Sequence, residues 1–368
     1  MTNTSDLLPV GLEDRLPQFA ARITGAMRAC LDVLASHGYD RVRPPLLEFE
    51  SSLASRMKGV ATERCFRMTD PASLRTLALR SDITPQIGRI AATSMRDAPR
   101  PLRLAYSGDT ALIDASQLDP ARERLQLGGE LIGADTVAAA IESVSVALEA
   151  LSAAGLTGLS VDFTMPDVLD TLATQDGSLD AQAIEAIRAE LDTKDAGGLK
   201  AAGGESYLPL LYATGPIADA LPQLRELDAS GALKSRLDAL EAIAARVAGQ
   251  ARLTLDPTER HGFEYQSWFG FTLYAQGVRG AAGRGGTYRI SGSEEVATGF
   301  TLYLDRLADA APEPRAERTI YLEEDHDREM ANQLRSEGAR TLAKLSDDEE
   351  PCALGCTHVL SGRELREL

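Results

Sequence analysis

The chain is short of cysteine, and this shortage argues against two classes of protein. Its four cysteines, among 368 residues, are too few and too scattered for a disulfide framework. Cys352 and Cys356 form a CxxxC, but no second pair or nearby histidine gives this spacing the pattern of a zinc site, which favours an ordinary reduced pair. We therefore expect neither a metal nor another cofactor.

Long apolar runs and an excess of positive charge are also missing. No segment approaches the roughly 20 apolar residues that a membrane helix needs, and the start, MTNTSDLLPVGLEDRLPQ, lacks the basic and apolar regions of a signal peptide. Lysine and arginine number 38 against 55 acidic residues, a net charge of −17. Nucleic-acid binders usually carry a basic surface, because phosphate neutralisation supplies most of their affinity. The composition predicts a cytoplasmic protein without a membrane or nucleic-acid partner.

The chain does contain a succession of apolar patterns, some with the spacing of helices and others with the alternation of strands. Residues 16–37 have the spacing of an amphipathic helix, and a strand is expected over 39–43. The runs 65–69 and 74–80 predict a β-hairpin, after which a helix should begin near Ser81 or Asp82, either of which could cap it. Strands are also expected at 101–107, 122–130, 157–163, 252–255 and within 263–305, and a long helix at about 135–154.

The order of these patterns indicates the domain organisation. Residues 166 to about 250 have a helical pattern within a region of strands, which predicts an insertion into a core that spans 1–310. Residues 311–318, APEPRAER, are typical of a linker, and 319–368 should form a small, truncated β-α-β domain. The expected fold class is α+β, with a mainly antiparallel sheet flanked by helices.

Six segments, in order, resemble the catalytic core of class II aminoacyl-tRNA synthetases, and the histidyl enzyme in particular. They are HGYDRVRPPLLE (37–48), LRSDITPQIGR (79–89), LQLGGELIG (125–133), ERHGFEYQSWFGF (259–271), GAAGRGGTYRI (280–290) and TGFTLYLDRL (298–307). The resemblance spans residues 7 to about 310. It implies the class II fold, a dimer interface built by a helix, a strand and a proline, and a pocket for histidine.

The resemblance implies a histidine pocket built from Asp82, Thr84, Gln126, Glu130 and Tyr265. An ammonium group needs carboxylates and neutral acceptors that converge on it, and Gln126 and Glu130 share one face of a strand because their spacing is even. Tyr265 could add a hydroxyl toward the imidazole. The alternative is that Asp82 only caps a helix, while Gln126 and Glu130 line a solvated strand face.

Adenylation requires cations on the ATP phosphates, and several of the groups that the family uses are replaced. Tyr106 stands where the resemblance implies an arginine on the α-phosphate, and Gly108 where it implies the glutamate that reads adenine. His261 occupies the place of the catalytic arginine, Gln266 that of a tyrosine, and Tyr303 that of a glycine. A hydroxyl does not replace a bidentate guanidinium, so we expect no adenylation.

Together these features resemble the histidyl-tRNA-synthetase-like regulatory subunits of ATP phosphoribosyltransferase. The resemblance implies a non-catalytic chain that forms a homodimer, assembles with the short catalytic subunit into a hetero-oligomer, activates it in the first step of histidine biosynthesis, and mediates feedback inhibition by the effector L-histidine. The effector site is either the pocket above or one at a subunit interface. Two alternatives remain: a divergent histidyl-tRNA synthetase, and an amino-acid sensor that acts on a kinase or a ribosome.

Overall fold

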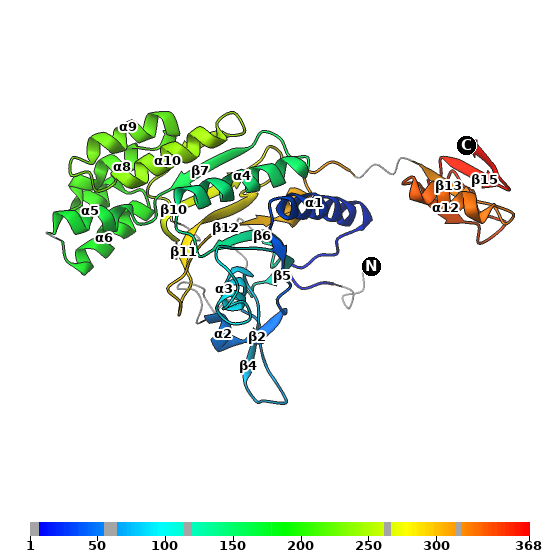
Figure 1. Cartoon of the computed structure of the whole chain (residues 1–368), viewed down its shortest axis with the longest axis horizontal. Helices are drawn as coiled ribbons and strands as arrows, with labels where there is room; N and C mark the ends of the chain where they lie inside the picture. The colour runs from blue at the N-terminus through cyan, green and yellow to red at the C-terminus, as the bar shows by residue number, and fades with distance from the viewer. Residues whose placement is uncertain (1–6, 55–64, 114–119, 178, 261–265, 314–317) are drawn as a thin grey trace. The chain divides into compact units, whose positions relative to one another are not determined.

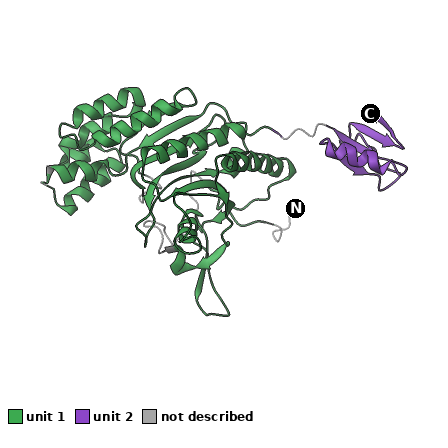
Figure 2. Ribbon diagram, in the orientation of Figure 1, with its two compact units in different colours: residues 1–312 green, residues 313–368 purple. Residues whose placement is uncertain are grey.

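The computed structural model describes residues 7–54, 65–113, 120–177, 179–260, 266–313 and 318–368. The chain divides into two units, residues 1–312 and 313–368, each with its own core (Figure 2). No helix in these described ranges combines the length and the apolar content that a membrane span requires.

A nine-stranded sheet forms the centre of the first unit, in the order β1-β5-β6-β12-β11-β10-β7-β9-β8 (Figure 1). Neighbouring strands are antiparallel except for the pairs β1–β5 and β7–β9. The expected α+β class with a mainly antiparallel sheet is thereby confirmed. The strands are β1 (Asp40–Arg41), β5 (Leu102–Ala111), β6 (Glu123–Ile132), β7 (Ser160–Thr164), β8 (Gly215–Pro216), β9 (Arg252–Leu255), β10 (Gln266–Tyr274), β11 (Gly283–Arg289) and β12 (Val296–Tyr303).

Helices cover the two faces of this sheet unequally. Helices α1 (Pro17–Ser36) and α4 (Val137–Ala153) pack against each other and against one face, where their apolar residues join Leu127 and Phe300 in the main core. Helix α3 (Thr84–Ala92) lies on the opposite face, and a second core forms there around residues such as Ile87 (Figure 1). Within the described ranges, the polar groups expected to bind a ligand lie on this second face.

A helical segment separates the parallel strands β7 and β9. It contains α5 (Val168–Asp176), α6 (Ala181–Asp192), α7 (Ala196–Ala201), α8 (Leu208–Tyr212), α9 (Ile217–Leu227) and α10 (Lys234–Val247). The short strand β8 within this segment was not expected from the sequence, because two residues are too few to give an alternating pattern. A four-residue helix, α11 (Leu304–Leu307), follows β12.

A small three-stranded sheet, in the order β2-β4-β3, stands beside α3 (Figure 1). It contains β2 (Leu47–Phe49), β3 (Arg67–Thr69) and β4 (Thr76–Leu79), and helix α2 (Glu50–Ala54) follows β2. The antiparallel pairing of β3 with β4 confirms the predicted hairpin. The predicted cap of the next helix is wrong: its N-cap is Ile83, without a side-chain bond. Asp82 instead accepts a hydrogen bond from the Thr84 amide at 3.2 Å, just outside the helix.

The second unit is a four-stranded sheet in the order β14-β13-β15-β16. It contains β13 (Thr319–Leu322), α12 (Arg328–Ser336), β14 (Arg340–Ala343), β15 (His358–Ser361) and β16 (Glu364–Glu367). The parallel pairing of β13 with β14 gives the β-α-β unit that the sequence predicted. The antiparallel hairpin β15–β16 was missed, because its strands are short and highly charged.

Candidate functional site

The alternation of side chains along β6 separates the polar site from the core. Leu127 is fully buried in the cluster that includes α1 and α4, while Gln126 and Glu130 lie on the other face, which α3 covers. The even spacing of Gln126 and Glu130 was the reason for expecting them on one face. Both side chains are buried, at 7% and 2% exposure, so the alternative of a solvated strand face is wrong.

The structure brings four of the expected pocket residues together. Asp82, Thr84 and Gln126 meet where the chain enters α3: the Gln126 Oε1 atom accepts a hydrogen bond from the Ile83 amide at 3.1 Å, and Asp82 holds the Thr84 amide. Side-chain hydrogen bonds link Gln126 to Asp82 and Thr84 to Glu130, and Thr84 and Glu130 line the same cavity. The fifth expected residue, Tyr265, lies outside the described residues, as does His261.

Burial dominates the electrostatics of this site. It raises the pKa of Glu130 to about 8, against the hydrogen bond that Tyr288 donates to Oε2 at 3.1 Å. The neighbouring charge of Asp82 acts in the same direction as burial. Burial also raises the pKa of Asp82, while hydrogen bonds from the backbone at Thr84 and Ile83 lower it. A cation that entered the site would stabilise the charged forms of these carboxyl groups and lower their pKa values.

Glycines form the floor of the site. Glu130 is paired in register with Gly299 of β12, Gly299 with Gly286 of β11, and Gly286 with Gly270 of β10. Three glycines therefore lie side by side across three neighbouring strands, at one end of which the Glu130 carboxyl group lies over Gly299. A row without side chains leaves space for a flat group directly against the backbone.

The cavity above this floor is too small for an amino acid. Its volume is ≈ 20 Å³, and its lining includes Thr84, Glu130, Gln266, Arg284, Tyr288 and Thr301. A cavity needs about 10–15 Å³ to hold one water molecule, so a histidine enters only if neighbouring groups move apart. Tyr288, Thr301 and Gln266 were not expected among the pocket residues, although their segments were. For Tyr288 and Thr301 the available signal was their alternation with Gly286 of β11 and Gly299 of β12.

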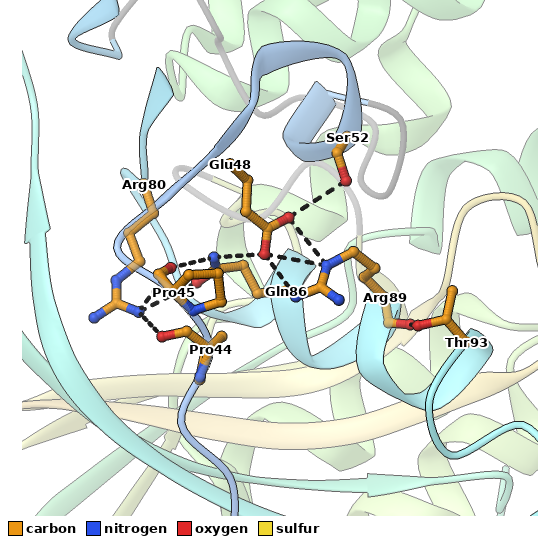
Figure 3. A network of polar contacts seen from close by, with 8 residues as sticks. All are labelled: Pro44, Pro45, Glu48, Ser52, Arg80, Gln86, Arg89 and Thr93. Carbon is orange, nitrogen blue, oxygen red and sulfur yellow. Dashed lines mark hydrogen bonds and ion pairs between the residues drawn. The ribbon is translucent and has the colours of Figure 1, made fainter. Parts of the chain in front are cut away.

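A buried polar network fixes the entrance to α3 (Figure 3). The Arg80 guanidinium donates to the carbonyl oxygens of Asp109 at 2.7 Å and Pro44 at 3.2 Å. The Gln86 side chain accepts a hydrogen bond from Arg80 and donates one to the Glu48 carboxylate at 2.9 Å. Glu48 also forms an ion pair with Arg89 at 2.6 Å. Figure 3 shows the side chains of Glu48 from β2, Arg80 after β4, and Gln86 and Arg89 from α3 meeting beside Pro44 and Pro45. The network holds the segment that carries Asp82 and Thr84.

The part of the sheet where the synthetase resemblance implies ATP groups is filled by side chains. Tyr106 is fully buried, and its hydroxyl lies 2.6 Å from the Thr301 Oγ1 atom and 3.4 Å from that of Thr84. The Arg80 guanidinium occupies the space above Gly108, where a Cβ atom would collide with Nη2. The changes at positions 106 and 108 thus coincide with a closed, hydrogen-bonded surface.

Two further arginines near this region are engaged elsewhere. Arg306, in the last of the six synthetase-like segments, donates to the Ala281 carbonyl oxygen at 2.9 Å, and its guanidinium carbon lies 5.1 Å from the centre of the Tyr303 ring. Arg260 faces Asp192 of α6 at 3.6 Å. Both guanidinium groups therefore have partners within the chain.

Comparison with known proteins gives this geometry a family. Residues 11–307 match the histidyl-tRNA synthetase family. The ATP phosphoribosyltransferase regulatory subunit of Rhodospirillum centenum is 38% identical to the chain, over 98% of the chain and 96% of the relative. The chain belongs to the family of ATP phosphoribosyltransferase regulatory subunits. This membership confirms the expected family and a non-catalytic role within it.

Solved structures of the family share its fold. An ATP phosphoribosyltransferase regulatory subunit/histidyl-tRNA synthetase from Bacillus halodurans superposes with a TM-score of 0.82 at 24% identity, covering 98% of this chain and 99% of that one. A chain of the ATP phosphoribosyl transferase (HisG:HisZ) complex from Thermotoga maritima gives 0.60 at 15% identity, covering 77% of this chain and 97% of that one. At these identities the likeness concerns the fold.

Proposed function

We propose that the chain activates the short catalytic subunit of ATP phosphoribosyltransferase in the first step of histidine biosynthesis and mediates its feedback inhibition by L-histidine. The observation that carries the proposal is the pairing of two features on one sheet face. The polar groups of an amino-acid pocket converge at Asp82, Thr84, Gln126 and Glu130, whereas the adjoining ATP region is filled by Tyr106 and Arg80. Such a chain can bind the amino acid without activating it.

Inhibition by histidine requires a differential affinity between two conformations. A ligand shifts an equilibrium only by as much as it binds one state better than the other. In the described residues the cavity beside Glu130 is ≈ 20 Å³, so a histidine complex is a different conformation from this one. Ligand binding and a change of shape are then linked, which is what a regulatory subunit needs.

The proposed assembly has two kinds of contact. The hetero-oligomer with the catalytic subunit is proposed from the HisG:HisZ complex, whose chain shares the fold. The homodimer is proposed from the unit formed by α1, β1 and Pro44, because β1 is an edge strand of the large sheet and both its residues are exposed. Closed two-fold contacts are the commonest form of self-association. A stable monomer in sedimentation at micromolar concentration would contradict the homodimer.

The test combines the full chain with the short catalytic subunit. The rate of phosphoribosyl transfer is measured with and without the chain, across a series of L-histidine concentrations. Addition of the chain should raise the rate, and histidine should lower it. Removing one partner of a buried charge pair costs on the order of 2–5 kcal/mol, so Glu130→Ala should weaken histidine binding at least about tenfold.

A matched control separates activation of the catalytic subunit from its inhibition by histidine. Glu294→Ala removes an exposed glutamate from the same unit and should leave both activation and inhibition unchanged. Glu130→Ala should relieve inhibition while activation persists, because assembly and the pocket use different groups. Unchanged histidine affinity and inhibition in Glu130→Ala would place regulation in another site.

A further inference from the structure

The side chain of Gln266 lies on the glycine floor of the pocket. Gln266 begins β10 opposite Tyr288, and a bulge separates this pair from the next one, between Gly270 and Gly286. Its amide reaches along the floor: a Cβ atom added to Gly286 would lie 2.5 Å from the Gln266 Cδ and Nε2 atoms. A Cβ atom at Gly270 would collide with Oε1 of the same side chain. The amide therefore occupies two of the three glycine positions.

This amide is only half satisfied. Its Nε2 atom donates to the Gly285 carbonyl oxygen at 2.9 Å, whereas Oε1 is buried without a hydrogen-bond partner. The residue as a whole is 8% exposed. A buried acceptor without a partner is destabilising, so the position of this side chain is weakly held.

Gln266 either accepts a hydrogen bond from a bound ring or occupies the place of that ring. The size of the remaining space decides between these two roles. If its oxygen accepted an N–H from a bound ring, a gap the size of that ring would separate it from Glu130. The cavity of ≈ 20 Å³ has room for about one water there. The amide itself takes the space in which a flat side chain would lie.

We propose that Gln266 is a plug that sets the affinity of this pocket: its amide covers the glycine floor and has to turn away before the side chain of the ligand lies there. The inference rests on the proposed binding of L-histidine and adds how that binding is limited. When the binding-competent state is a fraction of the population, the apparent affinity falls by that fraction. Shortening residue 266 should therefore tighten binding.

Calorimetric titration of the full chain with L-histidine tests this sign. Gln266→Ala and Gln266→Ser should both bind at least about fivefold more tightly than the wild type. The matched control Gln276→Ala, at an exposed glutamine, should bind as the wild type does. A crystal of the wild-type complex should show the Gln266 amide away from Gly286, with its bond to the Gly285 carbonyl broken.

The remaining outcomes separate this inference from the function on which it rests. Equal or weaker binding by the two Gln266 variants, together with loss of binding in Glu130→Ala, would overturn the plug and leave the histidine pocket in place. Weaker binding would make the glutamine oxygen a ligand for the ring instead, and equal binding would show that residue 266 does not affect affinity. If no form of the chain binds histidine, the proposed pocket fails, and the plug fails with it.

Discussion

Two adjoining parts of the same sheet face differ in how their polar groups are satisfied. Over β5, the Tyr106 hydroxyl has two partners and the Arg80 guanidinium donates to backbone carbonyls and to Gln86. Over β12, β11 and β10, a buried carboxyl group has a raised pKa and the Gln266 oxygen has no partner. The polar groups of the first part are paired and stabilise the fold. The second part keeps a buried carboxyl group and an unpaired amide oxygen, which lower the stability of the fold, as groups in ligand sites do.

The largest effect expected from this difference concerns ATP. The chain should catalyse ATP–pyrophosphate exchange with histidine at least about 10³-fold more slowly than a working histidyl-tRNA synthetase, because each lost charge-stabilising group costs roughly 10²–10³ in rate. The assay uses the purified chain at high concentration, with an active synthetase measured alongside. Exchange at a rate within about tenfold of that enzyme would mean that the filled part of the face opens to bind ATP. The two parts of the face would then not differ in function.

The second effect concerns the contribution of the filled part to stability. Arg80→Leu should lower the free energy of unfolding by about 3 kcal/mol, because it leaves the Pro44 and Asp109 carbonyl oxygens without the donor that Arg80 supplies. Urea denaturation measures the loss. The control Arg96→Leu removes an exposed arginine near the end of α3 and should change stability by less than about 0.5 kcal/mol. Equal effects would show that Arg80 fills space without stabilising the fold.

The third effect, which is spread over several pH units, concerns the pH dependence of stability. The pKa of Glu130 is raised from 4.5 to about 8 in the folded chain, so the folded state binds the proton more strongly than the unfolded state. The contribution of the protonated Glu130 side chain to the free energy of unfolding is fully present below about pH 4.5. It is lost as the pH rises toward 8, at about 1 kcal/mol per pH unit within that window.

Glu130→Gln should remove this slope, so that the variant gains stability relative to the wild type between pH 5 and pH 8. Glu294→Gln, an exposed control, should follow the wild-type curve. Parallel curves for wild type and Glu130→Gln would show that the Glu130 carboxyl group is ionised in the empty pocket, and the contrast between the two parts would weaken.

The sequence was sufficient for features that depend on local spacing. The even separation of Gln126 and Glu130 predicted their common face, and the run around Asp70 predicted the β3–β4 hairpin. The synthetase-like pattern identified Tyr106 and Gly108 as replacements. In each case the deciding information lies within about ten residues of chain or in one recognisable motif.

Features that depend on contacts between distant segments were not predictable. That Arg80 lies above Gly108 follows from the packing of β4 against the end of β5, and nothing local to either residue indicates it. The alignment of Gly299, Gly286 and Gly270 requires the register of three strands. The reach of Gln266 along this row requires the bulge in β10 as well. Register and bulges are set by tertiary packing.

Gly129, between the pocket and the helices, connects the site with the proposed dimer surface. It lies next to Glu130 in β6, and a Cβ atom there would lie 2.7 Å from a methyl carbon of Leu34 and 3.1 Å from the ring of Tyr39. Helix α1 and the residues that follow it therefore contact the back of the strand whose front holds the Glu130 carboxyl group, with a single layer of backbone between them. The pocket and the packing of α1 therefore share this one layer of backbone, and a side chain added at Gly129 would disturb the contact with α1 directly behind Glu130.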